Sequence, residues 1–576
     1  MKHSITQSLS WLHTWAGLIF GWALVAIFFT GTLAVFDKEI QQWLQPEVPV
    51  HAVDQQQAAA TAISYLQATH PQQSNWQVSL PTERWPRLAV SAGEAQGGGG
   101  GGRGNAMTSL DPVTGEVIKP RESAGGNFFF RFHYTLHFPR NIGVWVVGFL
   151  AMAMLAAIVS GIVIHKKFFK EFFTFRPNKG QRSWLDYHNA SGVLLLPFHI
   201  MITYTGLVIF FLIYMPAPME ALFDGDRQAY QAAMRGEPAG AGPRAEAGAE
   251  RPARGGEQGR PEQGTERAMT RGAEQAEGRG ARPGREQEPR QHLHDRTAEM
   301  NFPALLAKAE AELGPLSGFR LQRSPSGEAV FEARPVLGNI IELTKGRSLS
   351  LDALTGKVVK PVAESTGAGW VQRVMAGLHF AQFGGYPMRW LYFLCGMIST
   401  AMMAAGLLLF TVKRRRRYAK ESLAARFGYQ FIERVNIAIV AGLPLASIAL
   451  LWANRLLPVD LAGRAAHEIN AFFAVWGLSF LHASLRPWAK AWPEQLWLAG
   501  ALAIGLPLAN GFTGLPVLGN ASSLYLELTC MAMGALTLLA GWRAAQPQAV
   551  VTGKARKAKT PATSEVDDDA QESPAC

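Results

Sequence analysis

Two pairs of histidines recur at matching places in the two halves of the chain. Of the fourteen histidines, His13 and His188 stand in two similar stretches, and His137 and His379 precede two others. A neutral imidazole nitrogen is a good ligand for iron, and two imidazoles on opposite sides of one haem iron hold it without a covalent bond to the porphyrin. The ordinary alternative is a polar residue at the end of a membrane helix, among the aromatic side chains that gather at the interface.

The histidines belong to an internal repeat, which predicts the elements that position them. Each half has an apolar helix carrying the first histidine, then an outside segment with a short helix, strand-like runs and an Asp-x-x-Thr-Gly turn, then a second apolar helix preceded by Leu-His-Phe. His13 and His188, like Thr30-Gly31 and Thr205-Gly206, are 175 residues apart. The matched segments of the outside part and second helix are 111–117 with 352–358, 136–138 with 378–380, Trp145 with Trp390, and 160–161 with 405–406.

Apolar runs of about 20 residues predict a mainly α-helical, polytopic membrane protein. The eight candidate spans are 14–36, 142–164, 188–214, 388–411, 434–454, 466–485, 495–513 and 522–542. The three cysteines lie far apart, which excludes a disulfide scaffold, and the sequence has no Cys-x-x-Cys-His, which excludes covalently attached haem. No dinucleotide fingerprint, phosphate loop, zinc-protease motif or nucleophile elbow occurs.

The basic charge of the chain is a topology signal and not a sign of nucleic-acid binding. The net charge is +11, and the segments 166–182 and 413–434 carry +5 and +6 of it. Short basic loops beside apolar helices mark the cytoplasmic side, so both loops and both termini are predicted to lie inside. The segments 37–141 and 215–387 are then outside the membrane on the other face.

These patterns divide the chain into two repeats, a C-terminal extension and a tail. The segment rich in Arg, Glu, Gly, Ala, Gln and Pro is predicted to be a disordered insert, because it has too few large apolar residues to order a backbone. The predicted boundaries are 1–170 for the first repeat with an outside domain at 50–122, 183–417 for the second repeat with an outside domain at 300–362 and the insert at 235–290, 430–545 for an extension of four membrane helices, and 546–576 for a disordered cytoplasmic tail.

The paired Trp-Leu-His or His-x-x-x-Gly…Thr-Gly spans, with their outside domains and the Leu-His-Phe that follows, resemble the PepSY-associated transmembrane family of bacterial inner-membrane proteins. The resemblance covers roughly residues 1–417. It implies α+β PepSY-like domains in the periplasm and a link to iron uptake, since some members look like di-haem reductases of ferric siderophores. It says nothing of 430–545.

Within that architecture the sequence predicts two b-type haems in a four-helix bundle. His13 and His188 lie at the inner ends of two spans that run in the same direction, so they are expected to face each other across one iron, and His137 and His379 are expected to hold the second at the outer face. His199 follows His188 by eleven residues, about 20° of rotation and 16.5 Å of rise on a straight helix, so it is either a further ligand on the same stripe or a buried hydrogen-bonded histidine. His133, one turn before His137, is a substitute ligand, and His165 beside Lys166 is a further candidate whose counterpart in the second repeat is Phe410.

The predicted function is therefore transmembrane electron transfer through two haems to a ferric siderophore or related ferric chelate, with a quinol or a cytoplasmic reductase as donor. Two other classes stay open. One is a regulatory membrane protein whose outside domains bind a peptide or protein, without redox activity. The other is an eight-span transporter, for which internal repeats are also typical.

Overall fold

The computed structural model describes residues 5–546 apart from 52, 94–106, 166–175, 177–179, 227–228, 231–232, 234–295, 325, 339, 365–366, 419–420 and 519–520. The predicted insert therefore lies outside the described residues, as do all but the first residue of the predicted tail and most of the basic loop at 166–182.

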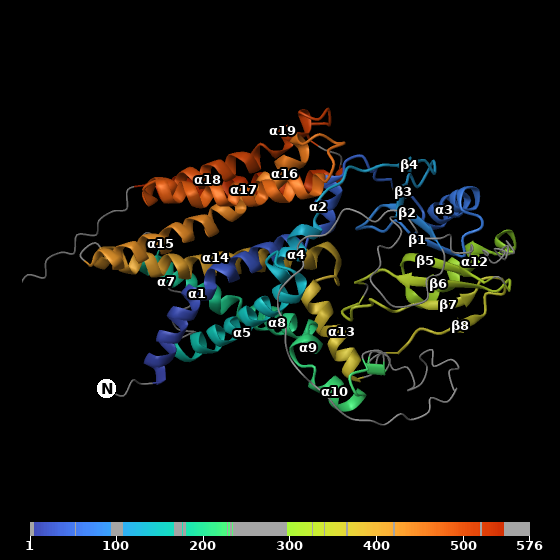
Figure 1. The fold of residues 1–576 in the computed structure, drawn as a ribbon, viewed down its shortest axis with the longest axis horizontal. Coiled ribbons are helices and arrows are strands. Elements are labelled where there is room, and N and C mark those ends of the chain that lie inside the picture. The colour runs from blue at the N-terminus through green and yellow to red at the C-terminus, as the bar shows by residue number, and fades with distance from the viewer. Residues whose placement is uncertain are drawn as a thin grey trace, which may run out of the picture.

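Helices dominate, with one sheet domain at one end of the molecule (Figure 1). The helices that matter below are α1 (Ile5–Ala34), α2 (Asp37–Leu44), α3 (Gln55–Thr69), α4 (Asn127–Thr135), α5 (Arg140–Ile164), α7 (Gln181–Leu194), α8 (Leu196–Ile209), α12 (Phe302–Leu313), α13 (Gly367–Phe380), α14 (Gly385–Tyr418), α15 (Leu423–Val440), α16 (Gly442–Leu456), α17 (Arg464–Leu485), α18 (Trp488–Ile504), α19 (Leu506–Gly511) and α20 (Ala521–Ala545). Short helices α9 (Phe211–Tyr214) and α10 (Ala217–Phe223) follow α8.

The sheet domain is a single antiparallel sheet built from both halves of the chain. Each half contributes one helix, α3 or α12, and four strands, and the strand order is β4-β3-β2-β1-β5-β6-β7-β8. The strands are β1 (Asn75–Ser79), β2 (Leu88–Gly93), β3 (Thr108–Leu110), β4 (Val117–Ile118), β5 (Leu316–Arg323), β6 (Ala329–Pro335), β7 (Leu349–Asp352) and β8 (Val358–Lys360).

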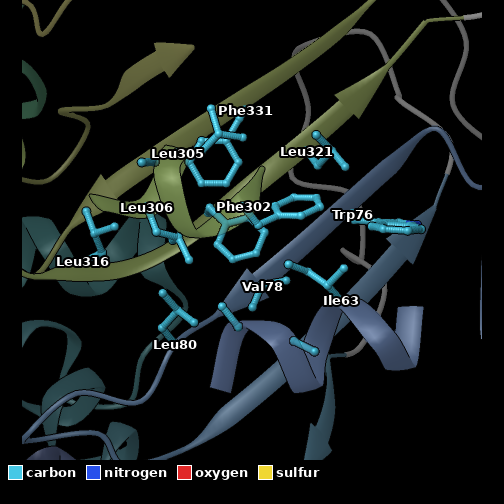
Figure 2. Packing of buried hydrophobic residues seen from close by; sticks show 14 of the residues in the cluster. Ile63, Trp76, Val78, Leu80, Phe302, Leu305, Leu306, Leu316, Leu321 and Phe331 are labelled. Carbon is cyan, nitrogen blue, oxygen red and sulfur yellow. The ribbon is translucent and has the colours of Figure 1, made fainter. Parts of the chain in front are cut away.

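The two halves of the sheet meet where β1 pairs with β5, with Trp76 opposite Leu321. Inward-facing residues of both halves and of α3 and α12 form one core (Figure 2), in which Phe319 and Phe331 stack with ring centres 4.9 Å apart. Gly318 at the join has a positive φ of 153°, and a Cβ there would lie 2.2 Å from the carbonyl oxygen of Val78. The join therefore requires glycine at this position.

In both halves the predicted Asp-x-x-Thr-Gly turn joins the last two strands of the sheet, β3 to β4 and β7 to β8. Asp352 Oδ1 accepts hydrogen bonds from the Thr355 hydroxyl at 2.7 Å and from the backbone N–H groups of Thr355 and Leu354. These bonds, those of Thr355 first, hold the pKa of Asp352 below its usual value. Gly356 takes the positive φ of 68° that closes the turn.

The helices form a polytopic membrane protein with fewer clear spans than the eight predicted. By length and composition the described residues contain five membrane-spanning helices, or six if a bent pair counts as one span. They are Ile5–Ala34, Arg140–Ile164, Gly385–Arg415, Leu423–Leu456 and Ser523–Ala545, with α7 and α8 as the bent pair. The predicted spans at 466–485 and 495–513 correspond to α17, which carries buried Glu468, and to α18 with α19, which break at Gly505. Helix α17 runs beside α15 and α16, and α18 runs beside α16 and α20 (Figure 1).

The straight helix predicted for 188–214 is wrong. The chain bends by 66° at Leu195, between α7 and α8. Pro197 lies in the first turn of α8, where it has no N–H for the preceding turn and its ring clashes with the carbonyl four residues back. The bend removes the common stripe that was expected to align His188 with His199.

A buried polar network joins the C-terminal extension to the first half of the chain. Arg464 and Glu468 form an ion pair of 2.5 Å with both side chains fully buried. Glu468 also accepts hydrogen bonds from Asn454 at 2.7 Å and from Ser123 and the Ala124 N–H at 2.8 Å. Residues 123 and 124 belong to the first half, so the extension is packed into the same body as the repeats.

Candidate functional site

The His13–His188 pair forms at the end of the bundle far from the sheet domain. His13 on α1 and His188 on α7 have ring centres 6.3 Å apart. His13 Nδ1 lies 3.0 Å from the carbonyl oxygen of Ala157 and 3.1 Å from the Ser160 hydroxyl, both on α5. His188 Nδ1 lies 2.8 Å from the carbonyl oxygen of Met402 on α14. Four helices thus position these two rings.

A second pair forms near the sheet domain, and its members are His133 and His379. Their ring centres are 5.9 Å apart. His133 Nδ1, on α4, lies 2.8 Å from the carbonyl oxygen of Ile27 on α1. His379 Nδ1, on α13, lies 3.0 Å from the carbonyl oxygen of Ile202 on α8 and 3.1 Å from the Thr205 hydroxyl. Ile27 follows His13 by fourteen residues on α1, so the two pairs lie about 21 Å apart along that helix.

The prediction that His137 lies opposite His379 is wrong. Helix α4 ends at Thr135, and Leu136 and His137 both take positive φ values, 49° and 64°. This turn carries the exposed His137 ring toward Phe473 on α17, 5.0 Å away between ring centres. His133, named only as a substitute, takes the place that was predicted for His137.

His199 belongs to neither pair. Its Nε2 lies 2.9 Å from the hydroxyl of Ser399, and the side chain is buried. Its ring centre is 6.4 Å from that of Phe28 on α1. Of the two readings that the sequence left open, the structure favours the buried, hydrogen-bonded one. His165 follows α5 as its C-cap, and its N–H donates to the carbonyl oxygen of Gly161.

All four paired histidines are held by one recurring local motif. Each ring packs against a glycine of a neighbouring helix. Its Nδ1 lies within hydrogen-bond distance of the backbone carbonyl oxygen four residues before that glycine. A Cβ on any of these glycines would lie between 2.5 and 3.3 Å from the ring. The matched sets are His133 with Ile27 and Gly31, His379 with Ile202 and Gly206, His13 with Ala157 and Gly161, and His188 with Met402 and Gly406.

This motif fixes the tautomer that a metal requires. A backbone carbonyl is only an acceptor, so each Nδ1 must carry the hydrogen and each Nε2 keeps a free lone pair. Metal-ligating histidines almost always donate their other N–H in this way. With metal–nitrogen bonds of about 2 Å and roughly 1 Å from nitrogen to ring centre, two imidazoles across one metal have ring centres about 6 Å apart. Both observed separations match that value.

A cavity of about 420 Å³ surrounds the His133–His379 pair. Its wall is mostly apolar and comes from α1, α5, α8 and α14, while exposed Arg140 and Lys345 also line it. A flat, largely apolar group with acidic substituents fits such a lining, because the two cations can pair with the acids. In the described part of the chain no three His, Cys, Asp or Glu side chains gather into a metal site. The two imidazole pairs, with their Nδ1–H groups bound to backbone carbonyls, are the residues that could hold a haem iron each.

The fold and the site together define a polytopic membrane protein with a duplicated helix-and-sheet domain and two partly buried imidazole pairs. The family model described as the PepSY-associated TM region matches residues 10–413, so the chain belongs to that family and the resemblance seen in the sequence is confirmed. A search of curated proteins gives no match. The C-terminal helices from α15 onward lie beyond the matched region.

Proposed function

We propose that this protein is a transmembrane electron-transfer protein with two b-type haems, which reduces ferric siderophores or related ferric chelates on the side of the sheet domain. The observation that supports the proposal most is the fourfold motif in which a glycine and a backbone carbonyl seat each paired imidazole. A bound haem would supply one-electron transfer by its iron. Iron(II) binds oxygen-donor chelators less tightly than iron(III), so such a reduction releases the metal.

The residues of the chain have separate roles in this proposal. His13 and His188 hold one iron, and His133 and His379 hold the other about 21 Å farther along α1. Arg140 and Lys345 pair with the acidic substituents at the site near the sheet domain. The two pairs lie at different positions along α1. Electron transfer from one face of a membrane to the other needs haems that are spaced in this way.

The haem content of the purified protein tests the proposal. Pyridine haemochrome analysis of full-length protein from haem-replete cells should give close to two haems per chain, and the reduced protein should show the sharp bands of low-spin b haem. A reproducible value near zero would reject the proposal and leave a haem-free binding or regulatory protein as the better account.

The glycine motif makes a sharper prediction. Gly31→Val should reduce haem at the site near the sheet domain, because its Cβ would lie 2.5 Å from His133 Nδ1 and push the ring away. Gly17→Val on the same helix is the matched control, since a Cβ at Gly17 meets nothing within 4 Å. Redox titration followed by visible absorption should show one altered haem in the first variant and none in the second. Equal spectra for the two variants would show that the glycine does not seat a ligand.

The orientation in the bacterial inner membrane is also part of the proposal. The proposed orientation follows the basic loops: Gln181 and the termini lie in the cytoplasm, and the segment around Gly255 and the sheet domain lie in the periplasm. A reporter that is active only in the periplasm should therefore work when fused near Gly255 and fail near Gln181. The opposite pattern would place ferric chelate reduction on the cytoplasmic side.

A further inference from the structure

A larger cavity, of about 1020 Å³, lies between the repeats and the C-terminal extension. One wall comes from α1 and α14, and the other from α16, α18 and α20. Its deeper part is apolar, with Leu33, Met397, Ile448 and Met533 among the lining residues. Its other end reaches the sheet domain, where Gln42, His51, Gln55 and Glu83 line it. This division suits an amphiphile whose head group lies beside the sheet domain and whose tail follows the helices.

The charges at the polar end disfavour an anionic lipid head group. Glu39 and Glu83 line the cavity, and its lining in the described part of the chain contains no lysine or arginine. Glu39 already pairs with Arg84 at 2.9 Å, but a phosphate beside Glu83 would meet a carboxylate with no cation in the described lining. A neutral head group would not be repelled by the carboxylate.

Aromatic side chains at the same level favour a flat, neutral ring. Phe36 on the α1–α2 connection lies 4.9 Å from Trp390 and 5.6 Å from Phe393, measured between ring centres, and Trp390 and Phe393 are 5.6 Å apart. All three line the cavity. Aromatic pairs prefer offset or edge-to-face contacts, which such a cluster offers to an inserted ring. An isoprenoid quinone or quinol combines a ring of this kind with an apolar tail.

The same two helices separate this cavity from the histidine cavity. Phe29 and Leu33 of α1 line the larger cavity, whereas Phe28 and Thr32 of the same turns line the cavity of His133 and His379. On α14, Phe393 lines the first and Gly396 the second. Packed helices have axes 8 to 10 Å apart, so a ring in the larger cavity would lie about one helix thickness from the imidazole pair.

We infer that the larger cavity binds an isoprenoid quinol and makes it the electron donor of the protein. This role rests on the proposed function. Oxidation of the quinol breaks two O–H bonds and forms two C=O bonds, and it releases two protons and two electrons. A haem held by His133 and His379, the pair next to this cavity, would take one electron, and a haem held by His13 and His188 would take the other. His51, 3.3 Å from Asp111 and 44% exposed, gives the protons a path to solvent.

Photolabelling of the full-length protein in lipid nanodiscs tests the binding. An azido-quinone probe should label peptides of α14 and α20 in the wild-type protein. Thr529→Trp places an indole in the cavity and should lower this labelling about tenfold or more. Leu528→Trp, next to it on α20 but 48% exposed and outside the lining, is the matched control and should label as the wild type does.

Two outcomes would overturn the inference: labelling spread evenly over the lipid-facing helices, or equal labelling of the two tryptophan variants. Recovery of a phospholipid from the cavity that an excess of quinone does not displace would also overturn it. The inference and the proposed function fail in different ways. Specific labelling of a protein without haem rejects the function and keeps the quinone site, whereas a haem-loaded protein that dithionite reduces but that takes up no probe rejects the quinone site alone.

Discussion

Alanine at position 133 should remove one of the two proposed haems from each chain, whereas alanine at position 137 should leave both. His133 faces His379 with ring centres 5.9 Å apart, and its loss leaves one side of that site without a ligand. His137 is exposed and points toward Phe473. Haemochrome analysis should fall from about two to about one haem per chain in His133→Ala, and redox titration should show that the remaining haem is the one held by His13 and His188.

Two further variants complete this test. His188→Ala should remove the other haem and spare the site near the sheet domain, because the two pairs share no residue. His199→Ala should keep both haems, since the His199 Nε2 is engaged by the Ser399 hydroxyl at 2.9 Å. If His137→Ala lost a haem while His133→Ala kept two, the pairing first expected from the sequence would be the correct one.

The error at His137 has a specific origin in the sequence. The tripeptide Leu-His-Phe occurs at 136–138 and 378–380, an offset of 242 residues, and it matched His137 to His379. The helices that follow keep an offset of 245, as Trp145 with Trp390 and Gly161 with Gly406 show, and that offset places His379 one residue from His133. Helix α13 continues through His379, whereas α4 stops two residues before His137. The offset of the helices therefore indicates Tyr134, and His133 beside it is the nearest imidazole.

Features set by neighbouring residues can be predicted from the sequence, whereas features set by the packing of distant helices cannot. The apolar helices and the two Asp-x-x-Thr-Gly turns depend on nearby residues, so the sequence predicts them. The Thr-Gly, Ser-Gly and Ala-Gly pairs mark the repeat in the sequence, but their packing against the imidazoles depends on which helices become neighbours. The bend at Leu195 has a local signal in Pro197, because a proline at this position disfavours a straight helix through 188–214.

Loss of Arg464 should destabilise the protein more than any other single substitution considered above. Arg464→Ala leaves the carboxylate of Glu468 fully buried without its cation, which typically costs about 3–5 kcal/mol. Thermal unfolding in detergent, followed by circular dichroism or by intrinsic fluorescence, should show a markedly lower midpoint. The matched control is Arg296→Ala, which breaks an exposed pair with Glu299 and should leave the midpoint unchanged.

A double variant separates the buried charge from the lost packing. Arg464→Met with Glu468→Met removes both charges and fills similar volume, so it should recover much of the stability lost in Arg464→Ala. If the double variant were as unstable as the single one, the hydrogen bonds of Glu468 to Asn454, Ser123 and Ala124 would be the important contribution. If Arg464→Ala unfolded at the wild-type midpoint, the network would not hold the extension to the repeats.

The continuous sheet imposes an order of events on synthesis. Strand β1 ends at Ser79 and its partner β5 begins at Leu316. The edge of β1 that pairs with β5 therefore has no native neighbour until well over 200 further residues have been made. At roughly 5–20 residues per second, ribosomes need about 12 to 50 seconds for that length. An unpaired strand edge attracts other strands, so the newly made first half is exposed to mispairing during this interval. Chaperone dependence and aggregation should therefore be greatest for chains stopped between the two halves.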